Sequence, residues 1–231
     1  MKKYFFSLFS LVFPVLCECC GRVLLQHEQT LCLHCLKDLP KTNYHLVVNN
    51  PLILQLKLAA KIDSANAFLH FTKNGVAQKL LHRLKYKDQI AVGTVLGRWF
   101  AEDIKDYVSR ENIEIIVPIP LHPSRRLKRG YNQAEVIAKG MKEILNLPIN
   151  NFSLRRRRKS QSQTKKDRVH RWKNTNDLYF LVKEESLIGK RVLLVDDVIT
   201  TGSTITGAVE LLKSVGTSYV SIACIATGKG F

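Results

Sequence analysis

The protein has 231 residues, of which 45% are hydrophobic, and its formal net charge at pH 7 is +17. A chain of this length and apolar content can bury the core of one medium-sized domain with a small appendage, which excludes a wholly disordered protein. The positive charge points to an anionic partner: a nucleic acid, a polyphosphate or an acidic surface.

The first segment of the sequence is MKKYFFSLFSLVFPVLC. Two lysines precede an apolar stretch and a cysteine, and this pattern resembles a secretory signal peptide. However, the residue before Cys17 is Leu16 rather than a small residue, and Pro14 falls where cleavage would occur. The apolar run 4–16 is also too short to span a bilayer. We therefore expect a cytoplasmic protein without a membrane span, whose first segment packs on its own domain.

Residues 1–45 carry two C-x2-C pairs, and each pair can direct two thiolates at one tetrahedral ion. The spacing predicts a structural zinc module with the ligands Cys17, Cys20, Cys32 and Cys35. Cys19 is adjacent to Cys20, and because neighbouring side chains point apart we assign Cys19 as a spare thiol. His27 and His34 are alternative ligands, and an iron–sulfur cluster is an alternative to zinc.

The part of the chain from residue 46 to residue 145 holds two helical patterns and one clear strand. Residues 46–75 have mixed polarity and weak periodicity, and they predict no element. Apolar residues at three- and four-residue steps predict a helix over 78–107. The β-branched run IEIIVPIP, 113–120, predicts a short buried strand. Asn132 is a candidate N-cap for an amphipathic helix over 132–145.

The second half adds a basic loop and further strands. The sequence predicts strands near 151–155 and at 177–182, 191–196 and 219–227, with a helix at 203–216. This order predicts an α/β domain over 46–231, in which helices flank a mostly parallel sheet. Ligands of such sheets bind beyond the carboxyl ends of the strands.

The positive charge is concentrated between Arg125 and Lys173, where sixteen Lys and Arg residues stand against three acids. Its densest part is 155–173, RRRRKSQSQTKKDRVHRWK, which is polar and has no apolar periodicity. These properties predict a mobile basic loop.

The run RVLLVDDVITTGST, 191–204, ends a buried strand in two aspartates and opens a helix with small residues. A receiver domain would need a later phosphoacceptor aspartate, and no aspartate follows Asp197. A Walker nucleotide site would need G-x4-G-K-[ST], which the sequence lacks. Both of these classes are therefore excluded.

The same run resembles the phosphoribosyl-pyrophosphate (PRPP) motif of type I phosphoribosyltransferases. The resemblance implies that a helix N-terminus and its backbone N–H groups surround a 5′-phosphate. The residues implied in this contact are Thr200, Thr201, Gly202, Ser203 and Thr204. Asp196 and Asp197 would hold the ribose hydroxyls and Mg²⁺, directly or through water.

Three further stretches extend the resemblance to the ComF family, which is named for competence and related to the amidophosphoribosyltransferase catalytic domain. They are VPIPLHPSRRLKRGYNQAE (117–135), LHRLKYK (81–87) and LRRRRK (154–159), in addition to the cysteine module. The resemblance implies a type I phosphoribosyltransferase fold with a pyrophosphate loop after VPIP. Its implied ligands are Arg126, Arg129, Asn132, Gln133 and Lys85.

The basic loop falls where this family of folds carries its mobile catalytic loop, which excludes water and stabilises the pyrophosphate leaving group. On this basis we assign Arg158 and Lys159 as the catalytic cations. The reaction implied is a displacement at C1 of the ribose.

Two functions follow from these features. One is an enzyme that transfers phosphoribose from PRPP to an unidentified acceptor. The other is a PRPP-sensing or DNA-binding protein without catalytic activity that acts in single-stranded DNA uptake, with DNA-uptake or recombination proteins as partners. The excess basic charge favours the second, and Trp172, Tyr131 and Tyr179 are candidates for stacking on bases.

Overall fold

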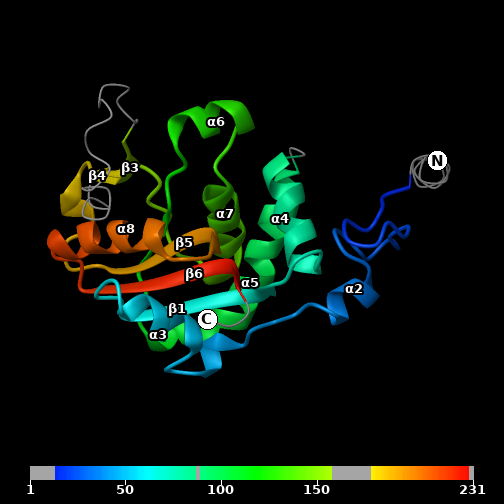
Figure 1. The fold of residues 1–231 in the computed structure, drawn as a ribbon, viewed down its shortest axis with the longest axis horizontal. Coiled ribbons are helices and arrows are strands. Elements are labelled where there is room, and N and C mark those ends of the chain that lie inside the picture. Colours follow the sequence, from blue (N-terminus) through cyan, green and yellow to red (C-terminus); the bar gives the residue numbers. More distant parts are fainter. Residues whose placement is uncertain (1–13, 87–88, 158–177, 229–231) are drawn as a thin grey trace.

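At the centre of the computed structural model, which describes residues 14–86, 89–157 and 178–228, lies a four-stranded sheet (Figure 1). All of its neighbouring strands pair in parallel, in the order β1-β6-β5-β2. The strands are β1 (Ser64–Phe71), β2 (Ile115–Pro118), β5 (Arg191–Ile199) and β6 (Tyr219–Gly228). The predicted α/β class with a parallel sheet is confirmed.

Helices cover both faces of this sheet (Figure 1). One layer consists of α4 (Val76–Tyr86), α5 (Ile90–Arg110) and α7 (Gln133–Leu145), and the other of α3 (Pro51–Lys57) and α8 (Ser203–Ser214). Along β5, Leu193 and Val195 join the first core, whereas Val192 and Leu194 join the second. Burial on both faces explains why the strand is a continuous apolar run rather than an alternating one.

The shorter elements lie around these layers. They are α2 (Leu33–Lys37), η1 (Tyr44–Leu46), α6 (Pro123–Arg129), β3 (Leu154–Arg156), β4 (Tyr179–Leu181) and η4 (Glu184–Ser186). β3 and β4 pair antiparallel with each other in a separate two-stranded sheet. The strands predicted near 151–155 and at 177–182 therefore lie outside the parallel sheet.

Two regions differ from the sequence-based expectation. Residues 46–75, for which no element is predicted, contain both α3 and the edge strand β1. The helix predicted over 78–107 is two helices, α4 and α5. The two helices have different partners, because α4 contacts the cysteine module whereas α5 runs along α7.

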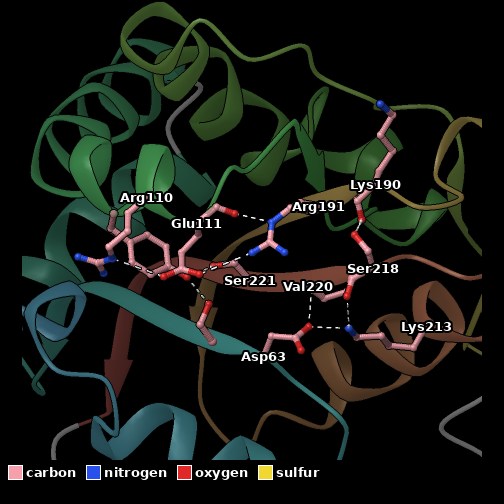
Figure 2. A network of polar contacts seen from close by, with 11 residues as sticks. Asp63, Arg110, Glu111, Lys190, Arg191, Lys213, Ser218, Val220 and Ser221 are labelled. Atoms are coloured by element: carbon pink, nitrogen blue, oxygen red, sulfur yellow. Dashed lines mark hydrogen bonds and ion pairs between the residues drawn. The ribbon is translucent and has the colours of Figure 1, made fainter.

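A polar network ties the amino ends of the strands together (Figure 2). The guanidinium of Arg191, at the start of β5, lies 4.0 Å from the centre of the Tyr219 ring, and its Nε donates to the carbonyl oxygen of Glu111. Asp63 Oδ2 accepts the N–H of Val220 at 2.7 Å. These contacts link the starts of β1, β5 and β6 at the end of the sheet opposite the predicted site.

Within the described ranges, no helix has both the length and the apolar character needed to cross a membrane. The prediction that the first segment packs on its own domain concerns residues 1–13, which lie outside the described residues.

α5 and α7 approach each other closely at two glycines. A Cβ added to Gly97 would lie 2.2 Å from the carbonyl oxygen of Ile137, and a Cβ added to Gly140 would lie 2.0 Å from that of Thr94. Because backbone rather than a flexible side chain occupies each position, any larger residue would push the helices apart.

Gly140→Ala tests this close approach. We expect it to lower the free energy of unfolding by about 1–3 kcal/mol, because overpacking outweighs the better helix propensity of alanine. Urea denaturation measures the change. Lys139→Ala, at the neighbouring exposed position, is the matched control and should stay within about 0.5 kcal/mol of the parent protein. Equal stability of the two variants would contradict the close approach.

Candidate functional site

The carboxyl end of β5 brings two carboxylates and one ammonium group together. Asp196 Oδ1 accepts the backbone N–H of Asp197 at 2.8 Å. Asp197 Oδ2 lies 2.8 Å from Nζ of Lys85, which is in the last turn of α4. The side chains of Lys85 and Asp197 are only 22% and 14% exposed. The structure thus joins three of the predicted site residues, from segments far apart in the sequence.

The electrostatics of this group favour a further cation. Burial raises the pKa of Asp196 well above its usual range, and the neighbouring Asp197 carboxylate raises the pKa further. A cation bound beside the pair would stabilise the ionised form of Asp196 and so lower this pKa. Carboxylate oxygens are the ligands that Mg²⁺ prefers, so the donor set at the end of β5 fits this ion.

The turn after β5 leads directly into the N-terminus of α8. Gly202, with φ +79°, is the N-cap residue, and no side chain described in the structure caps the helix. The first N–H groups of any helix lack partners within the helix, so this end can receive an anion. The residues around it with exposed surface are Thr200, Thr201, Ser203 and, in part, Thr204.

α3 supports this turn, although the sequence predicts no element there. Gln55 Nε2 donates to the carbonyl oxygen of Thr200 at 3.3 Å, and a Cβ on Gly202 would lie 2.4 Å from Leu56 Cδ2. The positive φ is the main reason for a glycine here, and a Cβ would in addition displace the end of the Leu56 side chain. The signal that could have revealed α3 is Asn50 followed by proline, because the Asn50 side chain caps the helix and proline is favoured at its first position.

The segment that follows β2 lies beside the aspartate pair. The N–H of Ile119 donates to the carbonyl oxygen of Val195 at 2.8 Å, which places the end of β2 next to the end of β5. Farther along, the Tyr131 hydroxyl donates to the carbonyl oxygen of Leu84 at the end of α4. Three segments therefore meet beyond the carboxyl ends of the strands: the end of β5, the end of α4 and the β2–α7 connection.

The four pyrophosphate ligands predicted in this connection differ in their surroundings. Arg126 makes two hydrogen bonds to the carboxylate of Glu135, at 2.9 and 3.3 Å. Arg129 Nη1 donates to Gln133 Oε1 at 3.0 Å. Asn132 is 3% exposed, caps α7 and donates to the loop after β2, and Gln133 is 2% exposed. Asn132 and Gln133 thus hold the connection in place, while the guanidinium groups lie nearer to solvent.

The predicted catalytic cations Arg158 and Lys159 lie outside the described residues, as does Trp172. On the β3–β4 pair, the guanidinium of Arg156 lies 5.6 Å from the centre of the Tyr179 ring. Tyr179 is 2% exposed, so its ring is not accessible for the base stacking considered from the sequence. Burial raises the pKa of the Tyr179 hydroxyl, which has no hydrogen-bond partner among the described residues.

The cysteine module brings its four predicted ligands together. The sulfur atoms of Cys17, Cys20, Cys32 and Cys35 all lie within 4.8 Å of one another. Cys20 is exposed and the other three are buried. The group fits a zinc module, and Cys19, His27 and His34 do not belong to it. Glu18 of the module pairs with Arg83 of α4 at 3.0 Å, and Lys79 of α4 donates to the Cys19 carbonyl oxygen at 3.4 Å.

Residues 85–230 match the family described as the phosphoribosyl transferase domain. The match spans more than half of the chain, which therefore belongs to this family. The matched range includes the aspartate pair, the turn before α8 and the last strand of the chain, β6.

Relatives with known names place the chain more narrowly. It is 32% identical over 149 residues to competence protein F of Haemophilus influenzae, covering 62% of this chain and 64% of that protein. Competence protein ComFC of Streptococcus pneumoniae is 32% identical over 152 residues, with 65% and 63% covered. DNA utilization protein YhgH of Escherichia coli is 25% identical over 217 residues, with 91% and 89% covered. The chain is thus a phosphoribosyltransferase-like protein of the ComF type, and it spans less than two thirds of the length of the two competence proteins.

Among solved structures, the fold is similar to glutamine PRPP amidotransferase from B. subtilis in complex with ADP and GMP. The identity is 20%, the TM-score is 0.42, and the match covers 57% of this chain and 25% of that one.

We expect the cysteine module to hold one metal ion per chain, and mass spectrometry of the purified protein both counts and identifies it. Cys32→Ser should lose the ion, because three sulfur ligands leave a tetrahedral site incomplete. Cys19→Ser is the matched control and should keep the ion, since Cys19 lies outside the group. Loss of metal in both variants, or in neither, would contradict the assignment.

Proposed function

We propose that the protein binds Mg-PRPP at the carboxyl end of β5 and transfers its phosphoribosyl group to an acceptor, with release of pyrophosphate. The observation that supports this most strongly is the position of Asp196 and Asp197 beside the N-terminus of α8, which no described side chain caps. Family membership supports the proposal independently.

In this proposal each part of PRPP has its own partner. The 5′-phosphate is bound by the backbone N–H groups that open α8 and by the hydroxyls of Thr201, Ser203 and Thr204. Asp196 and Asp197 accept hydrogen bonds from the ribose hydroxyls. Bound Mg²⁺, held at the same carboxylates directly or through water, would offset the charge of the pyrophosphate.

The pyrophosphate would lie toward the β2–α7 connection. Arg126 and Arg129 offer planar guanidinium groups that match phosphate oxygens, and Lys85 offers an ammonium group. In the reaction the bond from C1 to the pyrophosphate oxygen breaks, the electron pair leaves with the pyrophosphate, and the acceptor forms a bond to C1. Arg158 and Lys159 are proposed to stabilise the departing group.

The remaining assignments belong to the same proposal. Residues 1–45 form a zinc module with four thiolate ligands, and residues 46–231 form the phosphoribosyltransferase-like domain. Thiolate ligands persist where thiols stay reduced, which supports the cytoplasm as the compartment.

Isothermal titration with PRPP and Mg²⁺ tests the binding site. Replacing both Asp196 and Asp197 by Asn should weaken binding by roughly 100-fold or more, because two charged acceptors are lost. Glu210→Gln, on the exposed side of α8, removes one acidic charge and should leave the affinity unchanged. Undiminished binding by the double variant would contradict the site. Assays of pyrophosphate release with a panel of bases, amines and DNA then decide whether bound PRPP is turned over.

A second candidate function, contact with single-stranded DNA, rests on α6. None of its residues is buried, and it carries the basic residues Arg125, Arg126, Lys128 and Arg129. On the β3–β4 pair, the guanidinium of Arg157 lies 5.7 Å from the centre of the Phe180 ring, an arrangement suited to stacking on bases. The names of the relatives, competence and DNA utilization proteins, also favour it.

The dependence of DNA affinity on salt tests this function. Arg125→Gln combined with Lys128→Gln should weaken binding of a single-stranded oligonucleotide and reduce the slope of log K against log salt by about 1.4, since each lost phosphate contact removes about 0.7. Lys105→Gln combined with Lys139→Gln, on α5 and α7, removes the same charge elsewhere and serves as the control. An equal effect of both pairs would show a diffuse attraction rather than a site on α6.

A further inference from the structure

Lys85 forms an ion pair with Asp197, one of the two carboxylates proposed to hold Mg²⁺. Lys85 Nζ lies 2.8 Å from Asp197 Oδ2, and both side chains are largely buried. Asp196, the other carboxylate of the pair, already accepts a backbone N–H. A metal ion that approaches Asp197 therefore meets a positive charge at hydrogen-bond distance from its ligand.

We propose that Lys85 is a positioning residue that exchanges partners: it holds Asp197 until a ligand arrives and then transfers its ammonium group to the pyrophosphate. The proposal rests on the proposed PRPP site and deepens it. The exchange makes metal binding depend on the ligand. The metal ion alone binds weakly, whereas the metal ion and the pyrophosphate-bearing ligand strengthen each other's binding.

A hydrogen bond holds the backbone of the residue before Lys85, and the exchange needs only the Lys85 side chain. The carbonyl oxygen of Leu84 accepts the Tyr131 hydroxyl, which ties the end of α4 to the proposed pyrophosphate loop. Lys85 thus starts beside both of its proposed partners. A lysine side chain has a flexible four-carbon stem and a compact ammonium group, so it can turn from one anion to another without movement of the helix.

Repulsion between the Lys85 ammonium group and the metal ion favours the move of Lys85 from Asp197 to the pyrophosphate. An ammonium group and a divalent cation that share one carboxylate repel each other, and partial burial reduces screening by water. A metal ion without its ligand must displace Lys85 and leave that charge without a partner. Pyrophosphate supplies several anionic oxygens, so Lys85 then gains a new charged hydrogen bond as it loses the old one. Because such coupling is reciprocal, each ligand must raise the affinity for the other by the same factor.

Direct titration of Mn²⁺, a stand-in for Mg²⁺, into the purified full-length protein without PRPP tests the exchange. Lys85→Gln should bind Mn²⁺ about tenfold more tightly than the parent, because the competing charge is gone. The same variant should bind PRPP at saturating Mg²⁺ about tenfold more weakly, because one charged contact is lost. Opposite changes in the two affinities are the signature of the exchange, and a merely structural ion pair would not produce them.

Two further variants control the result. Lys79→Gln removes the same charge from the same helix but faces the cysteine module, so both affinities should remain at the parent values. Lys85→Arg keeps the charge and should keep the weak binding of Mn²⁺. In the parent protein, inorganic pyrophosphate should raise the Mn²⁺ affinity more than it does in Lys85→Gln, a comparison that remains valid if the variant is less stable.

The outcomes separate this inference from the function on which it rests. A parent protein that binds no PRPP would overturn the proposed function. If the parent binds PRPP but Lys85→Gln binds Mn²⁺ no more tightly, the exchange is overturned while the PRPP site stands. Equal loss of both affinities in Lys85→Gln would also overturn the exchange, because it would show that Lys85 only holds the site together.

Discussion

β5 is buried on both faces, and this burial determines the positions along the strand at which charged side chains can lie. Its side chains from Val192 to Val195 alternate between the two cores, so a carboxylate among them would lie in an apolar interior. The first position open to polar partners is the carboxyl end, where Asp196 and Asp197 stand. Burial at this end still raises the pKa of Asp196, and the neighbouring Asp197 carboxylate raises it further. The two packed layers thus produce the site as well as the fold.

Around this end, the surrounding segments are held by contacts between backbone and side chain. Asn132 joins the loop after β2 to the start of α7, Gln55 supports the turn before α8, and Tyr131 reaches the end of α4. Each contact ends on a backbone group, so each orients a segment and not merely a neighbouring side chain. The described part of the site is therefore held by contacts within the protein, and ordering this part would add little to the entropy cost of binding.

Local signals in the sequence predicted those parts of the fold that depend on neighbours in the chain. The apolar run of β5, the turn at Gly202 and the N-cap Asn132 are of this kind. β1 was missed because it begins with small and polar residues, and it becomes a strand by pairing with β6. The division into α4 and α5 was missed because apolar residues recur at helical spacing on both sides of the polar residues 87–89. The contact of Lys85 with Asp197 joins distant segments, so no local pattern indicated it.

α4 has two attachments, and together they connect the cysteine module to the candidate site. At one place Arg83 and Lys79 hold the module through Glu18 and the Cys19 carbonyl. Six residues beyond Lys79, about 9 Å along the helix axis, the same helix presents Lys85 to β5. A helix of this length is a stiff rod. The cysteine module and the aspartate pair therefore contact the same helix, so the small N-terminal unit packs against the element that carries Lys85.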